Sequence, residues 1–327
     1  MKIAIITDTW FAINGVVTTL RATSLELERR GHEVLVVEPS QFKFLSFPNY
    51  PDIHISLNVF KLKSILDEFC PDAIHIATEG PLGLAARFYC KKHKDIPYTS
   101  SYHTKFPEYL NIYYGTPKNW TYTYLRWFHK PSGRVLVTTQ SMKTELKLEG
   151  FSNLVIWGRG VDTDIFYPKL KNPNTSPVLL CVSRVSKEKN LENFCKLKGK
   201  KILVGDGPYL MDLKRQFPDV EYVGYKTGTA LADYYRQADV FVFPSISDTF
   251  GVVIIEALAC GIPVAAYPVT GPKDIITPGL TGYLESSLSA SIERCLTLDP
   301  KKIYLESQKY TWKAATDIFE ANLVKIN

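Results

Sequence analysis

Short apolar runs rich in valine and isoleucine recur along this chain, and longer segments with helical periodicity separate them. The runs are continuous rather than alternating, which is typical of strands covered on both faces of a parallel sheet. They read KIAIIT, EVLVVEP, AIHIAT, YTSSYH, RVLVTT and NLVIWG in the first half, then VLLCVSR, KILVGDG, VEYVGY, VFVFPS and PVAAYPV. The pattern predicts an α/β protein built from doubly wound parallel sheets.

The alternation lapses at residues 167–177, where YPKLKNPNTSP is rich in proline, asparagine, serine and lysine. Such a composition is typical of a linker. We therefore expect two Rossmann-like domains, at residues 1–167 and 168–305, and a C-terminal helix or helix pair at 306–327 that packs back on the first domain. Open parallel sheets bind ligands outside the carboxyl ends of their strands, so the expected site is a cleft that both domains face.

Composition excludes several classes of protein. No apolar stretch reaches the roughly 20 residues that span a bilayer, and MKIAIITDTW is a first strand rather than a secretory signal, so we expect a cytoplasmic protein. The six cysteines form no CxxC pair, which argues against a zinc site or a disulfide framework. The net charge of +6 is compatible with anionic ligands, a membrane surface or nucleic acid.

Candidate ligand-binding residues follow the predicted strands. Gly15 lies after the first strand in TDTWFAINGVVTTL, where a classical dinucleotide-binding domain would have GxGxxG. A single glycine here permits close approach to a phosphate, or it simply forms a turn. In the second half, Arg184 and Lys189 of SRVSKEKN could clamp a diphosphate or form a solvated basic loop, and Asp206 and Gly207 follow the next strand in VGDGP.

The segment SDTFGVVIIEALACG carries two acids, Asp248 and Glu256, around an apolar run. Asp248 belongs to a typical helix N-cap cluster, and the amides of Phe250 and Gly251 could face a ligand at that helix N-terminus. Glu256 lies in a helix that is apolar on every side, so we expect it to be buried. A buried acid needs a partner, either a protein donor or the hydroxyls of a ligand.

Two features of the first half are also candidates. His103 follows a predicted strand in SYHTKFPEYL. Residues 102–130 combine aromatic and basic side chains, and we single out Lys105, Trp120, Arg126 and Trp127 as acceptor or membrane contacts. The alternatives for this segment are stacking on single-stranded nucleic acid or an aromatic helix packed inside the domain.

The ordered motifs NGVVTTL, GHEVLVVEP, ATEGPLGLAAR, SYHTKFPEYL, RGVDTDIFYP, SRVSKEKN, VGDGP and FPSISDTFGVVIIEALACGIPVAAYPVTGPKDII resemble retaining glycosyltransferases of family 4. The resemblance implies the GT-B fold. More narrowly, the chain is similar to the bacterial branch of α-mannosyltransferases, sulfoquinovosyl transferases and diacylglycerol glycosyltransferases.

The resemblance also implies roles for single residues. Asp248 would bind the hydroxyls of the donor sugar, where many members have glutamate, and Glu256 would bind the ribose. The other implied roles are diphosphate neutralisation for Arg184 and Lys189, contact with the reacting sugar for His103, the phosphate-covering loop for Gly15 and the base site for Gly224 and Tyr225.

The implied activity is metal-independent transfer, with retention, of a hexose from a UDP- or GDP-sugar to a lipid hydroxyl at the inner face of an anionic membrane. One alternative is a GDP-mannose-dependent α-mannosyltransferase that acts on a glycan. An alternative of another class is a nucleotide-sugar-binding module without turnover. We expect no nucleic-acid partner.

Overall fold

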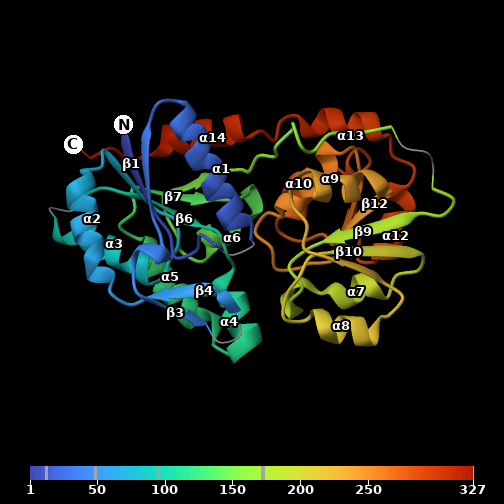
Figure 1. Ribbon diagram of the computed structural model, residues 1–327, viewed down its shortest axis with the longest axis horizontal. Coiled ribbons are helices and arrows are strands. Elements are labelled where there is room, and N and C mark those ends of the chain that lie inside the picture. The colour runs from blue at the N-terminus through green and yellow to red at the C-terminus, as the bar shows by residue number, and fades with distance from the viewer. Residues whose placement is uncertain (12–13, 48–49, 94–95, 171–173, 327) are drawn as a thin grey trace. The chain divides into compact units, whose positions relative to one another are not determined.

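The computed structural model describes residues 1–11, 14–47, 50–93, 96–170 and 174–326 (Figure 1). The chain divides into two compact units: unit 1 comprises Met1–Gly158 and Trp312–Asn327, and unit 2 comprises Arg159–Thr311. The division after residue 158 lies upstream of the boundary predicted after residue 167. Residues 171–173 of the predicted linker lie outside the described residues.

Unit 1 is built on a parallel six-stranded sheet of order β2-β1-β5-β6-β7-β8. Its strands are β1 (Lys2–Ile6), β2 (Glu33–Val37), β5 (Ala73–Ile76), β6 (Thr99–Tyr102), β7 (Arg134–Val137) and β8 (Leu154–Ile156). Each corresponds to a strand predicted from the sequence. The antiparallel hairpin of β3 (Phe44–Phe47) and β4 (Tyr50–Ser56) was not predicted.

Several helices of unit 1 begin at a polar cap or have proline in their first turn. The helices of this unit are α1 (Gly15–Arg29), α2 (Leu62–Phe69), α3 (Pro81–Lys92), α4 (Phe106–Tyr114), α5 (Lys118–His129), α6 (Gln140–Leu148) and α14 (Trp312–Asn322). Asn14 Oδ1 accepts from Val17 N at 2.9 Å and so caps α1. Thr139 caps α6 through Met142 N in the same way.

The C-terminal helix α14 packs against α1 within unit 1 (Figure 1). Phe319 is fully buried and contacts Trp157, whose indole Nε1 donates to Ala315 O at 3.1 Å. At the rim, Arg30 forms ion pairs with Asp317 and Glu320. These contacts join the last helix to the first half of the chain.

Unit 2 contains a second parallel sheet of order β11-β10-β9-β12-β13-β14. Its strands are β9 (Val178–Val182), β10 (Lys200–Val204), β11 (Glu221–Gly224), β12 (Val240–Phe243), β13 (Val264–Ala266) and β14 (Gly282–Leu284), of which only β14 was not predicted. Its helices are α7 (Leu191–Cys195), α8 (Leu210–Gln216), α9 (Gly228–Gln237), α10 (Val252–Ala259), α11 (Pro272–Ile275), α12 (Leu288–Cys295) and α13 (Pro300–Ser307).

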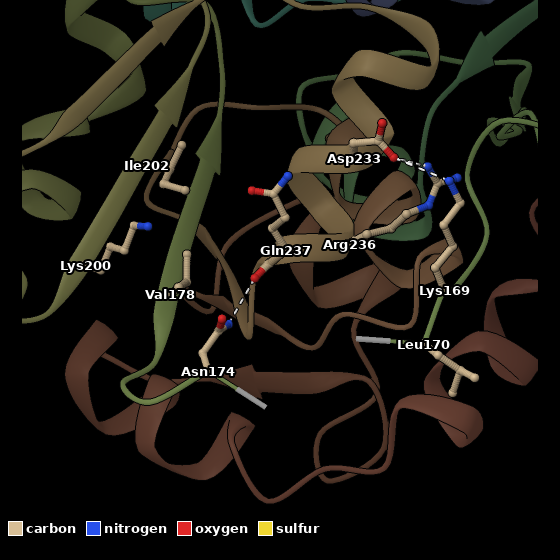
Figure 2. A pocket seen from close by; sticks show the side chains of 9 residues that line it. All are labelled: Lys169, Leu170, Asn174, Val178, Lys200, Ile202, Asp233, Arg236 and Gln237. Carbon is tan, nitrogen blue, oxygen red and sulfur yellow. Dashed lines mark hydrogen bonds and ion pairs between the residues drawn. The ribbon is translucent and has the colours of Figure 1, made fainter. Parts of the chain in front are cut away.

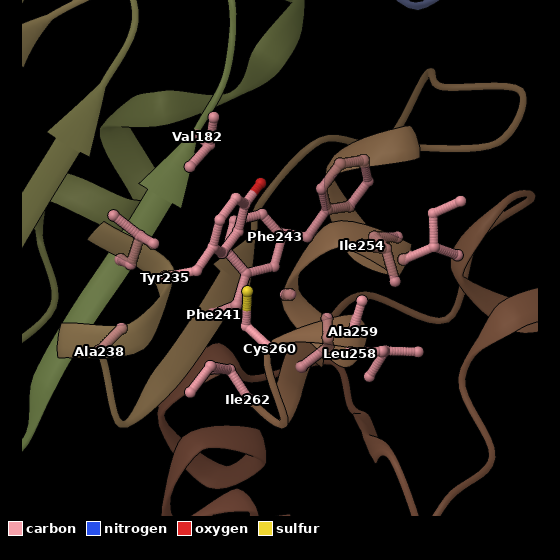
Figure 3. Close-up of a cluster of buried hydrophobic side chains, with 14 of the residues drawn as sticks. Val182, Tyr235, Ala238, Phe241, Phe243, Ile254, Leu258, Ala259, Cys260 and Ile262 are labelled. Atoms are coloured by element: carbon pink, nitrogen blue, oxygen red, sulfur yellow. The ribbon is translucent and has the colours of Figure 1, made fainter. Parts of the chain in front are cut away.

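Strand β9 explains why the predicted strands are continuously apolar. Leu180 and Val182 belong to a core cluster shared with α9 and α10 (Figure 3), whereas Leu179 and Cys181 belong to a second cluster shared with α7 and α12. Successive side chains point to opposite faces of a strand, and here both faces are covered. The doubly wound α/β prediction is therefore confirmed.

Each sheet has one position where the strand order reverses, between β1 and β5 in unit 1 and between β9 and β12 in unit 2. Loops diverge at such a position, and ligands of open parallel sheets bind there. No helix among the described residues is long and apolar enough to cross a bilayer.

Candidate functional site

In unit 2, two predicted site residues meet at the position where the strand order reverses. Lys189 lies in the 3-10 turn Lys187–Lys189, which follows β9, and Asp248 lies in the loop after β12. Lys189 Nζ donates to Asp248 Oδ1 at 2.6 Å, and the side chains are only 14% and 20% exposed. Arg184, which is half-buried, follows β9 in the same loop. This arrangement supplies cationic donors for an anionic ligand.

Asp248 does not cap α10, although the sequence offered that alternative. The helix begins at Val252, and its N-cap residue is Gly251, with φ of 93° and no side-chain cap. The second carboxylate oxygen of Asp248, Oδ2, is buried and has no hydrogen-bond partner among the described residues. An unsatisfied buried acceptor is costly, so this oxygen is available to a hydroxyl donor.

Phe250 and Gly251 were predicted to offer amides to a ligand. The Phe250 side chain is buried in the core cluster that β9 shares with α9 and α10, and Gly251 is the N-cap residue of α10. The first amides of a helix have no intrahelical acceptor. Residues 250–252 therefore bring helix N-terminal amides to the same loop as Asp248.

The loop after β10 depends on two glycines that contact the loop after β9. A Cβ atom on Gly205 would lie 1.8 Å from Ser183 O, and one on Gly207 would lie 2.4 Å from Val185 O. Asp206 Oδ1 accepts from Gly207 N at 2.7 Å, so its carboxylate shapes the turn. The predicted residues Asp206 and Gly207 thus support the segment that leads from Arg184 to Lys189.

Gly224 and Tyr225, the predicted base site, end the neighbouring strand. Gly224 is the last residue of β11, and its carbonyl accepts from Gly205 N at 2.9 Å. Tyr225 is 45% exposed. An exposed ring at the carboxyl end of a strand is available to stack on a planar ligand.

Glu256 has a side-chain partner in the protein, which is one of the two alternatives that the sequence left open. Tyr235 of α9 is fully buried, and its hydroxyl lies 2.8 Å from Glu256 Oε2. Glu256 itself is half-buried on α10, whereas the sequence predicted that it would be buried. Burial raises the pKa of Glu256 to about 7, while the hydrogen bond from Tyr235 opposes this rise.

In unit 1, His103 and Gly15 also lie beyond the carboxyl ends of strands. His103 follows β6, is 7% exposed and lies edge-on to Trp157, with ring centroids 5.7 Å apart. Gly15 is the first residue of α1, directly after the capping Asn14. The two residues therefore lie at the edge of the sheet that the fold predicts for ligands.

A half-buried carboxylate that the sequence analysis missed organises this edge of unit 1. Asp8, just after β1, accepts from Leu82 N at 2.7 Å, from Gly83 N at 3.3 Å and from Thr78 Oγ1 at 2.8 Å. Burial raises the pKa of Asp8 despite these hydrogen bonds. Asp8 therefore joins the end of β1 to the N-terminus of α3. Its place immediately after the first strand was the available signal.

The aromatic segment of unit 1 has two faces. On α5 the inner residues Tyr122, Leu125 and Phe128 are buried, which fits packing inside the domain. The outer face carries Trp120, 73% exposed, and Trp127, 43% exposed. A helix face on the surface is usually polar, so these exposed indoles indicate a contact surface.

The two cations predicted for this surface form contacts inside the protein. Lys105 is only 8% exposed, because its ammonium pairs with Glu145 at 2.7 Å. Arg126 Nη1 donates to Glu149 O at 3.0 Å. Trp127 instead lies on the guanidinium of Arg87, which is 3.7 Å from the ring centroid. Of the predicted surface residues, the two indoles are the ones most exposed.

A cavity of about 360 Å³ in unit 2 contains none of the predicted residues (Figure 2). Val178 and Lys200, which line it, begin β9 and β10, so it lies at the opposite end of the strands. Arg236 donates there to Ile165 O, Tyr167 O and Asp233. These hydrogen bonds hold residues 165–167 on α9, so we infer that Arg236 stabilises the fold of unit 2 rather than binding a ligand.

Comparison with known sequences matches the two halves of the chain to two families. Residues 13–165 match the family described as Glycosyltransferase Family 4, and residues 162–302 match the family described as Glycosyl transferases group 1. Together these matches contain every predicted site residue.

Relatives similar over most of the chain include transferases with different names. The chain is 27% identical to a GDP-mannose-dependent alpha-mannosyltransferase of Mycobacterium tuberculosis, over 87% of this chain and 83% of the relative. It is 28% identical to the sulfoquinovosyl transferase of Arabidopsis thaliana, over 89% and 66%. It is also 28% identical to the alpha-monoglucosyldiacylglycerol synthase of Streptococcus pneumoniae, over 92% and 79%.

Solved structures share the fold at lower sequence identity. A sucrose-phosphate synthase from Thermosynechococcus elongatus has a TM-score of 0.80 at 20% identity, covering 98% of this chain and 97% of the other. Anabaena HepE in complex with UDP and glucose has a TM-score of 0.74 at 17% identity, covering 98% of both chains.

Proposed function

Because this chain is a family-4 glycosyltransferase with the GT-B fold, we propose that it moves a hexose from a UDP- or GDP-sugar to the hydroxyl of a membrane lipid. Transfer from a nucleotide sugar follows from the family. The lipid acceptor, retention of configuration and independence of metal are the parts proposed here.

The donor half of the proposal rests on the loops after β9 and β12. A leaving nucleoside diphosphate carries developing negative charge, and the cations Arg184 and Lys189 lie where the strand order of unit 2 reverses. Preorganised positive charge at such a point stabilises the transition state without reorganisation. The same charge would take the place of a metal ion, so we expect no metal requirement.

Two carboxylates would bind the neutral part of the donor. Asp248, whose oxygen Oδ2 is buried without a hydrogen-bond partner among the described residues, would accept from a sugar hydroxyl, and Glu256, eight residues later in the sequence, would accept from the ribose hydroxyls. Aspartate is one methylene shorter than glutamate, so the ion pair with Lys189 would help to hold Asp248 at the required position. Retention needs no protein nucleophile if the leaving phosphate oxygen takes the proton of the acceptor.

The observation that carries the lipid acceptor is the aromatic outer face of α5. Trp120 and Trp127 are seven residues, or about two helical turns, apart on that face, and Phe88 of α3 lies beside Trp127 at 6.1 Å between ring centroids. Lys91 and Lys92 of α3 are exposed near these rings along the same helix as Phe88. Indole rings flanked by lysines are suited to the interface of an anionic bilayer. A relative named for diacylglycerol glycosylation supports this choice.

Transfer to lipid is tested by incubating the protein with UDP-glucose, UDP-galactose, UDP-glucuronate or GDP-mannose and vesicles that contain diacylglycerol. We expect a glycolipid product from one donor, at the same rate in EDTA. Release of free sugar alone would contradict the lipid acceptor. Loss of activity in EDTA that Mg²⁺ restores would contradict metal independence.

Replacing Trp120 and Trp127 together with alanine is expected to weaken binding to phosphatidylglycerol vesicles about tenfold or more, because both indoles lose their burial in the interface. Vesicle sedimentation at low salt measures the bound fraction. The matched control is Phe60→Ala, which removes a ring that is 80% exposed elsewhere on unit 1. Equal loss in the control, or no loss in the double variant, would contradict the assigned surface.

A second candidate is mannose transfer from GDP-mannose to a glycan, which the similarity to the mannosyltransferases favours. It predicts product with a soluble mannoside and none with diacylglycerol in the same assay. A nucleotide-sugar-binding module would bind the donor and release no UDP or GDP in the presence of any acceptor.

A further inference from the structure

We infer that Tyr235 is a positioning residue of the nucleotide site, because its hydroxyl holds one oxygen of Glu256 and so fixes the carboxylate that would bind the ribose. The hydroxyl lies 2.8 Å from Glu256 Oε2 and 3.2 Å from Val253 O. This inference rests on the proposed function, in which Glu256 contacts the nucleotide.

The tyrosine ring has no room to move away from this position. It is fully buried in the core between α9, α10 and the sheet (Figure 3). Phe241 and Phe166 contact it, with ring centroids at 5.5 Å and 5.9 Å. A close-packed side chain keeps one rotamer. The Tyr235 hydroxyl therefore stays in one place and holds the carboxylate of Glu256, on α10, by a hydrogen bond.

The Tyr235 hydroxyl has two possible acceptors, Glu256 Oε2 and Val253 O, so it can form a hydrogen bond with Glu256 in either protonation state. A phenol has one proton to donate and can also accept. With Glu256 ionised, Tyr235 donates to Oε2, and the other carboxylate oxygen remains an acceptor for ribose hydroxyls. When Glu256 is protonated, its carboxyl group can donate a hydrogen bond to the Tyr235 oxygen, while the Tyr235 hydroxyl donates to Val253 O. The second oxygen can accept in both states, but only in the ionised state does the carboxylate carry the negative charge that strengthens hydrogen bonds from ribose hydroxyls.

The titratable groups around this pair are few among the described residues. Tyr235 is influenced by Glu256 of α10, by Cys260 at the C-cap of α10 and by Cys181 of β9. Burial raises the pKa of Cys260 to about 12 and that of Cys181 further, so both thiols keep their protons. Arg236 and Asp233, farther along α9, pair with each other at 2.7 Å. Near neutral pH, Glu256 is thus the member of this cluster that changes charge.

The test is the pH dependence of nucleotide binding, with UDP and GDP as probes in isothermal titration calorimetry from pH 5.5 to 9. In the native protein, the Kd is expected to rise as the pH falls below about 7. In Tyr235→Phe the hydrogen bond that favours the ionised form is lost. If this loss raises the pKa of Glu256 by about one, the Kd of the variant should be close to native at pH 9 and about tenfold above native at pH 6.

Two further variants separate positioning from general damage. Tyr222→Phe removes another partly buried phenol of unit 2, which donates to Leu213 O and Phe217 O, and it should leave the pH midpoint unchanged. Glu256→Gln carries no titrating carboxyl, so its own Kd should show no step near pH 7. The ratio of its Kd to the native Kd should therefore rise with pH, whereas the same ratio for Tyr235→Phe should fall. Titration of the nucleotide phosphates is common to all variants and cancels in these ratios.

Each outcome has one meaning. If Tyr235→Phe changes the Kd by the same factor at every pH, or keeps the native midpoint, Tyr235 does not position Glu256 for binding and the inference fails. If Glu256→Gln binds both probes as the native protein does over the whole range, the ribose role itself fails. Should Tyr235→Phe not fold, the midpoint of Glu256→Asp decides: a carboxylate one methylene farther from Tyr235 should show the same upward shift, and an unchanged midpoint would refute the inference.

Discussion

Replacing Lys189 with alanine is expected to lower kcat for sugar transfer about 100- to 1000-fold, the range found when one preorganised donor to a developing charge is removed. Two effects combine in this variant. The leaving diphosphate loses a cation, and Asp248 loses the ammonium that lies 2.6 Å from its Oδ1. Steady-state kinetics with the donor varied at saturating acceptor measures kcat and KM separately.

Lys187→Ala is the matched control, because Lys187 lies in the same 3-10 turn and is exposed. Its kcat should stay within about twofold of the native value. If Lys189→Ala raised KM and left kcat unchanged, Lys189 would contribute ground-state binding only, and its proposed role at the leaving group would be wrong.

Glu256→Gln is expected to stabilise the ligand-free protein at pH 8 while it weakens nucleotide binding. The pKa of Glu256 is raised from 4.5 to about 7 in the folded protein, so folding favours the protonated form. The stability associated with this group is present below pH 4.5 and is lost as the pH rises toward 7. Removing the charge should recover on the order of 3 kcal/mol at pH 8.

Differential scanning calorimetry at pH 5 and pH 8 measures this effect. We expect the Tm of Glu256→Gln to exceed the native Tm by roughly 5–10 °C at pH 8 and by much less at pH 5. A difference that is equal at both pH values would mean that ionisation of Glu256 does not destabilise the fold. A lower Tm at pH 8 would contradict the sign of the pKa shift.

The sheets could be predicted because their strands carry the signal locally. Leu179 to Val182 of β9 are all buried, since core clusters lie on both faces of the strand, and this produces a continuous apolar run. The hairpin β3–β4 carries no such run: Phe44 and Leu45 are exposed. β14 reads Gly-Tyr-Leu and so lacks the run of branched aliphatic residues that marks most of the other strands.

The residue types at the site could be predicted, whereas their pairings could not. Lys189 and Asp248 are 59 positions apart, and Tyr235 and Glu256 are 21 apart, so only the folded sheet brings them together. Asp248 has the chemistry of an N-cap, but the chain turns at Gly251 before the helix begins. Lys105 has the chemistry of a surface cation, yet Glu145, 40 positions away, holds it inside. Tertiary contacts outweigh local preference in each case.

The hydrogen bonds of Asp8 limit how this protein can be recombined with its relatives. The β5–α3 loop is held by a carboxylate from β1, and a Cβ atom on Gly83 would lie 1.8 Å from Thr78 O. A chimera that imports this loop must therefore import its partner after β1 as well. Residues 8 and 78–83 form one structural unit, although more than sixty positions of sequence lie between its two parts.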